Sequence, residues 1–356
     1  MSSVGDGTVD LVVTSPPYPM IEMWDAAFGG ADPIVEEALI AGEGKRAFDR
    51  MHDELDGVWR ECKRVLRPGG FLCINVGDAT RSVDDEFRLY SNHSRIISSC
   101  ESIGFRSLPL ILWRKQTNAP NKFMGSGMLP SGAYVTLEHE YLLVFRNGPK
   151  RTFNRDEAVR RRRSAFFWEE RNSWFSDLWE LKGVRQLLPS NAARSRSAAF
   201  PLELVNRVVN MYSLQEDTVL DPYLGTGTTS AAALLNGRNS IGYEMHEELA
   251  PVIRHSLHTI AGMANRQVAQ RLDSHIAFVK EYAGRAGKKM GHTNAFYGFP
   301  VMTKQEREIR LPGLDSLVEE ETLRFVGDHS DAPLDADRYA SQTTMEESQP
   351  WLEWGK

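Results

Sequence analysis

Apolar residues along the chain form two kinds of pattern, short continuous runs and longer segments with helical spacing. Residues 8–14 are rich in Val and Leu without a polar face, which predicts a strand buried on both faces of a parallel sheet. Apolar residues recur every three or four positions from Phe48 to Leu66, which predicts a helix that ends at the turn Arg67-Pro68-Gly69-Gly70. Such strand–helix alternation is typical of α/β proteins.

The alternation continues to about residue 261. We expect further strands over residues 71–76, 108–113, 138–145, 218–221 and 239–244, and further helices over residues 91–102, 199–212 and 246–261, with an alanine-rich helix after Thr228. Residues 115–131 and 284–298 lack periodicity, which predicts loops there. A helix is expected over residues 268–282. The last fifty residues are acidic with few apolar runs, so we expect partial disorder there.

Composition places the chain among soluble globular proteins. Its 356 residues suit one large domain with an insertion, or two domains. Cys62, Cys73 and Cys100 have neither a pairing pattern nor metal-ligand spacing, which favours a reducing compartment. No run approaches the roughly 20 apolar residues of a membrane span, and the first residues are polar, so we expect a cytoplasmic protein without membrane contact. His255 and His258 lack a third spaced ligand, so no metal site is expected.

Charge is distributed unevenly, although the net charge is -6. Residues 146–196 carry 13 Lys and Arg against 6 Asp and Glu, a net +7, whereas residues 304–356 carry 6 against 13, a net -7. The basic segment contains the run Arg160-Arg161-Arg162-Arg163, followed by aromatic residues that could stack on or wedge between bases. The asymmetry favours a nucleic-acid contact here, and a solvated helix face with core aromatics is the alternative.

A stiff turn, Ser15-Pro16-Pro17-Tyr18, follows the first strand. Neither proline has an N–H, so the chain must leave the sheet. The turn offers the Ser15 hydroxyl, a carbonyl of Ser15 or Pro16 and the Tyr18 ring, which together suit a flat ring with an amino group. An ordinary proline-rich turn is the alternative reading of these four residues alone.

A glycine-rich turn lies between the strand at 218–221 and the alanine-rich helix. Gly225 and Gly227 permit positive φ and a close approach of a ligand, and the helix N-terminus offers free N–H groups to an anion. Glu244 ends the next strand, 23 residues after Asp221, where a carboxylate can bind both hydroxyls of a ribose. The segment lacks GxGxxG and a Walker Lys, so a ligand with adenosine but without a pyrophosphate fits better. A tight turn with a surface Glu is the alternative.

Both turns resemble motifs of amino-group DNA methyltransferases of the permuted β class. Ser15-Pro16-Pro17-Tyr18 is similar to that family's catalytic (S/D/N)PP(Y/F) motif. Phe200-Pro201 and the segment Asp221 to Thr228 are similar to the cofactor motifs that follow the target-recognition region in this class. Residues 61–70 and 138–145 also resemble family segments, so the resemblance covers about residues 8–262.

The resemblance implies a Rossmann-like methyltransferase sheet with helices on both faces, a circularly permuted motif order and an inserted DNA-recognition region. The implied division is a catalytic half over 1–145, a target-recognition region over 146–196, a cofactor-binding half over 197–265 and an acidic C-terminal extension over 266–356. The implied cofactor is S-adenosyl-L-methionine, and the implied partner is double-stranded DNA with a base flipped out of the duplex.

Roles for individual residues come from the same resemblance. The implied catalytic turn holds the target amino group between Ser15 and the Pro16 carbonyl and stacks the base on Tyr18. Implied catalytic residues are Ser15, Pro16, Pro17 and Tyr18; implied cofactor-binding residues are Phe200, Pro201, Asp221, Pro222, Gly225, Gly227, Thr228 and Glu244; expected DNA contacts are Lys115, Arg160, Arg161, Arg162 and Arg163.

Ser at the first motif position resembles N4-cytosine enzymes, whereas Asp is typical of N6-adenine enzymes. No Pro-Cys dipeptide is present, which argues against C5-cytosine chemistry. We therefore expect an N4-cytosine methyltransferase, the modification half of a restriction–modification system with a cognate endonuclease. An N6-adenine enzyme, a binding module without chemistry, and a methyltransferase acting on RNA or a protein amide stay open as alternatives.

Overall fold

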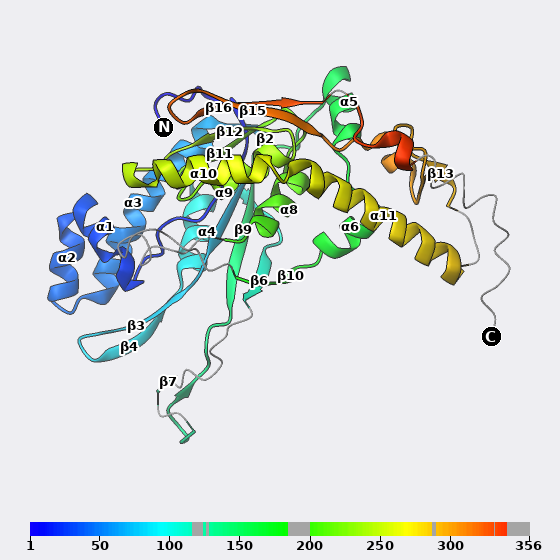
Figure 1. The fold of residues 1–356 in the computed structure, drawn as a ribbon. Coiled ribbons are helices and arrows are strands. Elements are labelled where there is room, and N and C mark those ends of the chain that lie inside the picture. Colours follow the sequence, from blue (N-terminus) through cyan, green and yellow to red (C-terminus); the bar gives the residue numbers. More distant parts are fainter. Residues whose placement is uncertain (116–123, 126–127, 184–199, 287–289, 331, 340–356) are drawn as a thin grey trace.

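The computed structural model describes the chain except residues 116–123, 126–127, 184–199, 287–289, 331 and 340–356. Its main sheet contains β1 (Val9–Thr14), β2 (Leu66–Val76), β5 (Phe105–Ser107), β6 (Ile111–Lys115), β9 (His139–Asn147), β10 (Leu178–Leu181), β11 (Thr218–Asp221) and β12 (Asn239–Gly242). Seven strands lie in the order β10-β6-β9-β2-β1-β11-β12, and β5 pairs with β9 (Figure 1). The strands β2, β1, β11 and β12 run parallel, whereas β9 is antiparallel to β2.

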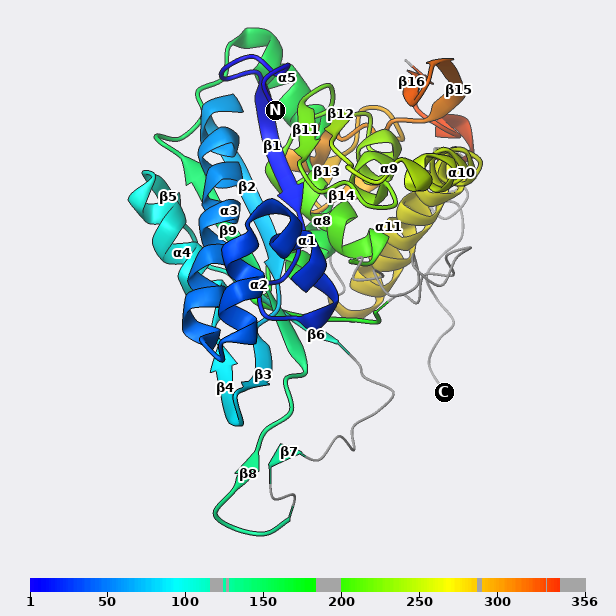
Figure 2. The ribbon, with the colours of Figure 1, turned by 90° about the vertical axis from the view of Figure 1, so that its left-hand side faces the viewer.

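Helices cover both faces of this sheet (Figure 2). Side chains alternate along β1, so Val12 packs in the core with α3 (Gly44–Val65) and α4 (Asn92–Ser102), whereas Leu11 and Val13 pack with α8 (Leu202–Tyr212) and α9 (Thr228–Leu235). All six residues of β1 are buried, as the unbroken apolar run predicts for a central parallel strand. None of the described helices is long and apolar enough to cross a membrane.

The second strand begins earlier than the sequence predicts. β2 starts at Leu66, directly after α3, so the run Arg67-Pro68-Gly69-Gly70 belongs to the strand and is no separate turn. Its pairing with β1 shifts register between Leu66 and Phe71, and Gly69 has a φ of +83°. A glycine with positive φ accommodates the extra residues of a bulge, so these residues bend the strand without ending it.

Two hairpins project from the end of the sheet where β2 ends and β9 begins (Figures 1 and 2). They are β3 (Ala79–Val83) with β4 (Glu86–Tyr90), and β7 (Met124–Gly125) with β8 (Ala133–Tyr134). Phe87 and Tyr134 are exposed, and their rings stack with centroids 4.8 Å apart. The two hairpins therefore meet in front of this end of the sheet.

The basic segment and the C-terminal extension fold together rather than apart. Phe167 packs in one core cluster with Leu272, Tyr297 and Phe299, and Arg271 forms an ion pair with Glu170. Residues 264–286 form one helix, and residues 314–321 and 324–329 form strands within the last fifty residues. The elements concerned are α5 (Arg155–Arg163), α6 (Trp168–Trp174), α11 (Ala264–Ala286), β13 (His292–Thr293), β14 (Pro300–Val301), η3 (Lys304–Glu308), β15 (Leu314–Glu321) and β16 (Arg324–His329).

The remaining elements are short and flank the sheet. They are η1 (Glu22–Trp24), α1 (Asp25–Ala31), α2 (Pro33–Ile40), η2 (Glu247–Leu249) and α10 (Ala250–Ala261). Residues 29–40 thus contribute to α1 and α2. Asp32 caps the second, because its side chain accepts a hydrogen bond from the N–H of Ile34.

Candidate active site

The proline turn and the glycine turn meet at one end of the sheet, where β1 and β11 end. β1 and β11 are parallel neighbours with Val12 opposite Leu220, so the turns that follow them begin side by side. The Thr14 hydroxyl donates a hydrogen bond of 2.7 Å to Oδ1 of Asp221. Two motifs 207 residues apart in the sequence are thereby joined at the carboxyl ends of adjacent strands, where open α/β sheets bind their ligands.

Asp221 is the buried anchor of this junction. Its Oδ1 also accepts the N–H of Tyr223 at 3.0 Å, and its Oδ2 accepts the hydroxyl of Thr229 at 2.6 Å. Burial raises the pKa of Asp221 to about 6, although the three donors act in the opposite direction. The carboxylate ties the end of β1 to the start of α9, which fixes the glycine turn between them.

The glycine turn has the geometry of a ligand cradle. Gly225 and Gly227 have φ values of +56° and +86°, and a Cβ at Gly227 would lie 3.3 Å from the Ile253 side chain. The Gly225 N–H donates to Oε2 of Glu244 at 2.9 Å, and the His246 N–H donates to Oε1 at 2.8 Å. Each carboxylate oxygen keeps a further lone pair, which suits the two hydroxyls of a ribose.

A groove of about 760 Å³ opens beside this cradle. Leu224, Gly242 and Glu244 line one end of it, and the groove extends along β12 to the β15–β16 hairpin. Its volume lies in the range of small-molecule and cofactor sites. The groove and the N-terminus of α9 therefore provide space and donors for a cofactor with a ribose and an anionic end.

The Tyr18 hydroxyl is the centre of a hydrogen-bond network. It donates to Oε2 of Glu140 at 3.0 Å and accepts a hydrogen bond of 2.8 Å from Nδ2 of Asn75. The Ser15 hydroxyl lies 3.0 Å from the Tyr18 hydroxyl oxygen. The second oxygen of Glu140 pairs with Lys115. Burial, followed by the charge of Glu140, raises the pKa of Tyr18 well above its ordinary value, so the phenol stays protonated.

A second buried contact holds the loop after Tyr18. Asn92 donates to the carbonyls of Pro19 at 3.1 Å and Gly77 at 2.9 Å, which ties the turn to the end of β2. Because its Nδ2 donates twice, its Oδ1 accepts the proton on Nε2 of His52 at 3.0 Å. Burial lowers the pKa of His52 to about 4, so this imidazole is neutral and serves as a structural donor.

Comparison with known proteins decides the family. A model of N6/N4 methyltransferases, described as DNA methylase, matches residues 9–255. The chain belongs to this DNA methylase family. It is 49% identical to the Type II methyltransferase M.MthZI of Methanothermobacter thermautotrophicus over 87% of each chain, and 44% identical to the Type II methyltransferase M.MjaI of Methanocaldococcus jannaschii over 78% of this chain and 93% of that protein.

The fold of the methylase matches that of a putative DNA modification methylase from Thermus thermophilus, solved in complex with S-adenosyl-L-methionine. The TM-score is 0.56 at 30% identity, over 73% of this chain and 89% of the other. The predicted α/β sheet with helices on both faces is therefore confirmed.

The implied cofactor residues of the methylase differ in their surroundings. Pro222, Gly225, Thr228 and Glu244 are half-buried around the glycine turn, which brings them together with Asp221. Phe200 instead packs in the core cluster with Leu11 and Val13, and Pro201 precedes the first turn of α8. A contact between Phe200 and the cofactor stays a prediction.

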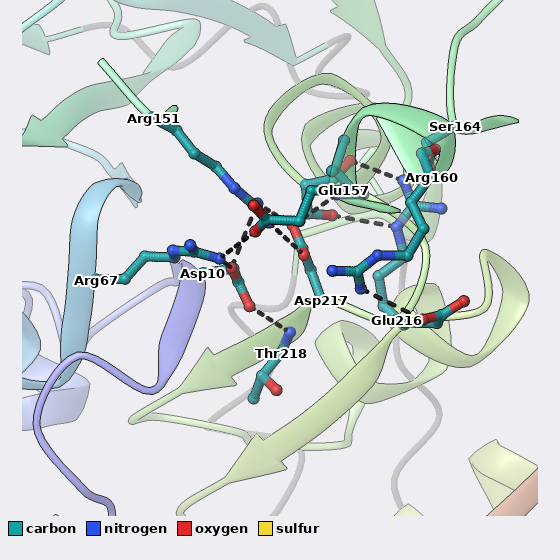
Figure 3. Close-up of polar contacts among 12 residues, drawn as sticks. Asp10, Arg67, Arg151, Glu157, Arg160, Ser164, Glu216, Asp217 and Thr218 are labelled. Atoms are coloured by element: carbon teal, nitrogen blue, oxygen red, sulfur yellow. Dashed lines mark hydrogen bonds and ion pairs between the residues drawn. The ribbon is translucent and has the colours of Figure 1, made fainter. Parts of the chain in front are cut away.

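The four arginines of the basic run lie on α5, and contacts around Asp10 tie this helix to the sheet. The Asp10 carboxylate accepts the N–H of Thr218, the first residue of β11 (Figure 3). Ser15 follows the other end of β1, and a six-residue strand spans roughly 20 Å. The position of α5 therefore argues against a direct contact between the arginine run and a base held at Ser15.

Several of these arginines have partners within the chain. Arg160 forms an ion pair with Glu216 at 3.3 Å, and Arg162 pairs with Glu308 at 2.9 Å. The guanidinium of Arg161 lies 4.5 Å from the centre of the Phe153 ring, and the carbonyl of Arg163 accepts the N–H of Arg310. The partners give α5 a structural role, and DNA contact by the arginines stays a prediction.

Sequence reasoning missed the roles of Asn75 and Glu140. The expected DNA contact of Lys115 stays a prediction, and its ammonium pairs with Glu140 and lies 4.7 Å from the centre of the Trp113 ring. Asn75 and Glu140 are buried. A polar residue inside each of two apolar strands was a usable signal, because a buried amide or carboxylate needs a partner. The sequence alone did not say that Tyr18 is this partner.

Proposed function

We propose that the protein is a site-specific DNA methyltransferase that methylates the exocyclic N4 of a cytosine flipped out of the duplex. The hydrogen bond between Thr14 and Asp221 carries this proposal, since it places a turn for an amino-bearing ring next to a turn for a nucleoside cofactor. Methyl transfer needs both reactants held in line, and such orientation can remove roughly 7–11 kcal/mol of the barrier.

S-adenosylmethionine is the cofactor, and when bound it supplies a methyl group activated on a positively charged sulfur. Glu244 would hold the ribose hydroxyls, and the backbone from Gly225 to Thr228 at the start of α9 would hold the amino-acid end. The groove along β12 offers space for the adenine. These residues bind and orient the cofactor without a covalent step.

Ser15 and the backbone of the proline turn would hold the target amino group. An exocyclic amino nitrogen is a weak nucleophile because its lone pair is delocalised into the ring. Hydrogen bonds from its two N–H groups to Ser15 and to the Pro16 carbonyl localise that lone pair as the methyl group arrives. The three cysteines are buried, and burial raises their thiol pKa, which supports a direct transfer without a covalent thiolate adduct.

The DNA would approach the end of the sheet that carries both turns. The β3–β4 hairpin and β8 project there, with Phe87, Leu89 and Tyr134 exposed (Figure 2). Exposed aromatic and apolar side chains can stack on or wedge between bases, which stabilises a duplex from which one nucleotide has left. We propose this pair of hairpins as the part of the methylase nearest the flipped base.

The likeness to two Type II methyltransferases supports a role in restriction and modification. We propose that the protein protects host DNA from a cognate endonuclease at the same recognition sequence. Expression in a host without this gene, followed by sequencing of modified bases, would give the recognition sequence and the position of the methyl group together.

A labelling experiment tests the target base. DNA methylated with labelled S-adenosylmethionine is digested to nucleosides, and we expect the label in N4-methyl-2′-deoxycytidine. Label in N6-methyl-2′-deoxyadenosine would overturn the cytosine assignment and retain the family. An unlabelled digest, from protein that binds the cofactor by calorimetry, would overturn DNA methylation itself.

A further inference from the structure

A continuous chain of hydrogen-bonding groups leads from Ser15 into the protein. The Ser15 hydroxyl lies 3.0 Å from the Tyr18 hydroxyl, and this hydroxyl lies 3.0 Å from Oε2 of Glu140. Tyr18 is 6% exposed and Glu140 9% exposed, so both groups are largely shielded from bulk water. Lys115, whose side chain is 39% exposed, contacts the other oxygen of Glu140 and connects it to the surface.

The carboxylate sets the direction of every hydrogen bond in this chain. A phenol has one proton, and Tyr18 directs it to Glu140. The Tyr18 oxygen then acts as acceptor toward its other neighbours, one of which is Nδ2 of Asn75. Ser15 must therefore donate its own proton to Tyr18, which leaves the lone pairs of Ser15 free to accept an N–H from the target base.

We propose that Glu140 is the final proton acceptor of the methyl transfer, reached through Ser15 and Tyr18. The proposal rests on the proposed DNA methylation. Glu140 acts through the two hydroxyls and does not touch the base, so its role is to orient Ser15 as an acceptor and to receive the proton that leaves the amino nitrogen.

The proton transfer balances without another reactant. The bond from carbon to sulfur breaks as the bond from carbon to the amino nitrogen forms, and the nitrogen must lose one proton. That proton passes to Ser15 as the Ser15 proton passes to Tyr18 and the Tyr18 proton to Glu140. The positive sulfonium and the carboxylate become a neutral thioether and a neutral carboxylic acid, and solvent removes the proton beside Lys115.

Glu140→Gln is the decisive variant, because its amide oxygen can still accept from Tyr18 but cannot take up a proton. We expect the single-turnover rate of methyl transfer to fall about 100-fold, in the range of general base catalysis. Calorimetry should give unchanged cofactor and DNA affinities. Tyr18→Phe should lose a similar factor, and the double variant should lose no more than either single variant, since both interrupt one path.

The pH profile separates proton transfer from a merely structural role. The pH dependence of the single-turnover rate should differ between the wild type and Glu140→Gln, because the variant removes the carboxylate that contacts Tyr18. The titratable groups that contact Glu140 are Tyr18 from the turn and Lys115 from β6. Two further titratable groups lie beyond the end of β2: Asp78, which follows Gly77, and its partner His93.

Two further measurements complete the test. Glu138→Gln is the matched control, since Glu138 lies two residues earlier and pairs with Arg114 near the surface, and it should keep the wild-type rate. Without cofactor or DNA, the ¹³Cζ resonance of labelled Tyr18 should move in Glu140→Gln and stay unchanged in Glu138→Gln, because it reports the hydrogen bond to the carboxylate.

Each outcome decides between the proposals. A wild-type rate and pH profile in Glu140→Gln would overturn the proton path and leave DNA methylation intact. A wild type that methylates no DNA would instead overturn the proposed function. If Glu140→Gln fails to fold, Tyr18→Phe with an unchanged rate and an unchanged pH profile would also refute the path.

Discussion

At the scale of single residues, two buried titratable groups near the active site oppose each other. Between pH 4 and its ordinary pKa of 6.5, His52 binds fewer protons in the folded than in the unfolded chain, so its contribution to stability is lost as pH falls. Asp221 has a pKa raised from 3.8 to about 6, so its contribution is present at acid pH and is lost as pH rises through 6. Each shift corresponds to about 3 kcal/mol.

Single substitutions should reveal how each group contributes to the pH dependence of the free energy of unfolding. Between about pH 7.5 and about pH 4, the free energy of unfolding of His52→Gln should rise by about 3 kcal/mol relative to that of the wild type, because the variant lacks the group that resists charging. The free energy of unfolding of Asp221→Asn should fall by a similar amount relative to the wild type over the same range. Urea denaturation at both pH values measures the differences. Parallel pH curves for His52→Gln and the wild type would show that the pKa of His52 is the same in the folded and the unfolded chain.

At the scale of elements, an ion network fixes α5 against the sheet. Arg151 pairs with Asp217 at 2.6 Å and with Glu157 at 3.0 Å, and Arg67 joins Glu157 to Asp10 (Figure 3). The Arg151 side chain is 11% exposed and that of Asp217 is 2% exposed. The N–H of Asn154 and then Arg151 lower the pKa of Glu157 to about 2, so Glu157 stays charged over the physiological range.

Removal of the central cation should therefore be costly. We expect Arg151→Gln to lower the free energy of unfolding by about 3–5 kcal/mol, because it leaves buried carboxylates without their partner. Arg161→Gln is the matched control on the exposed side of α5, and it should cost less than about 1 kcal/mol. Urea denaturation of the two variants would contradict this account if both lost the same amount.

At the scale of the whole molecule, patterns that repeat locally were predictable and contacts between distant segments were not. The buried strand at residues 8–14 and the strand at 218–221 follow from apolar runs, and the two turns follow from Pro and Gly chemistry. The basic segment packs on the C-terminal extension through contacts such as that of Phe167 with Leu272 in one core cluster. No local periodicity of the sequence predicts this contact. Glu140 was likewise predicted only as part of a strand, because its partner Tyr18 lies 122 residues away.

The placement of the two ends of the sheet leads to a prediction about DNA binding. Arg88 is exposed on the β3–β4 hairpin at the end that carries Ser15, whereas Arg161 is exposed on α5 at the other end. If the duplex binds at the catalytic end, Arg88→Gln should weaken DNA binding at all sequences and lower the salt slope of log affinity by about 0.9, the value for one phosphate contact.

Arg161→Gln is the comparison that locates the duplex, since it removes the same charge from the opposite end. We expect its affinity and salt slope to match the wild type in filter binding at several salt concentrations. A slope lowered in Arg161→Gln and unchanged in Arg88→Gln would place the duplex over α5, as the charge pattern of the sequence predicts. The base at Ser15 would then be too far from the bound backbone for a single flipped nucleotide, so the same result would require a bent duplex that wraps around the sheet.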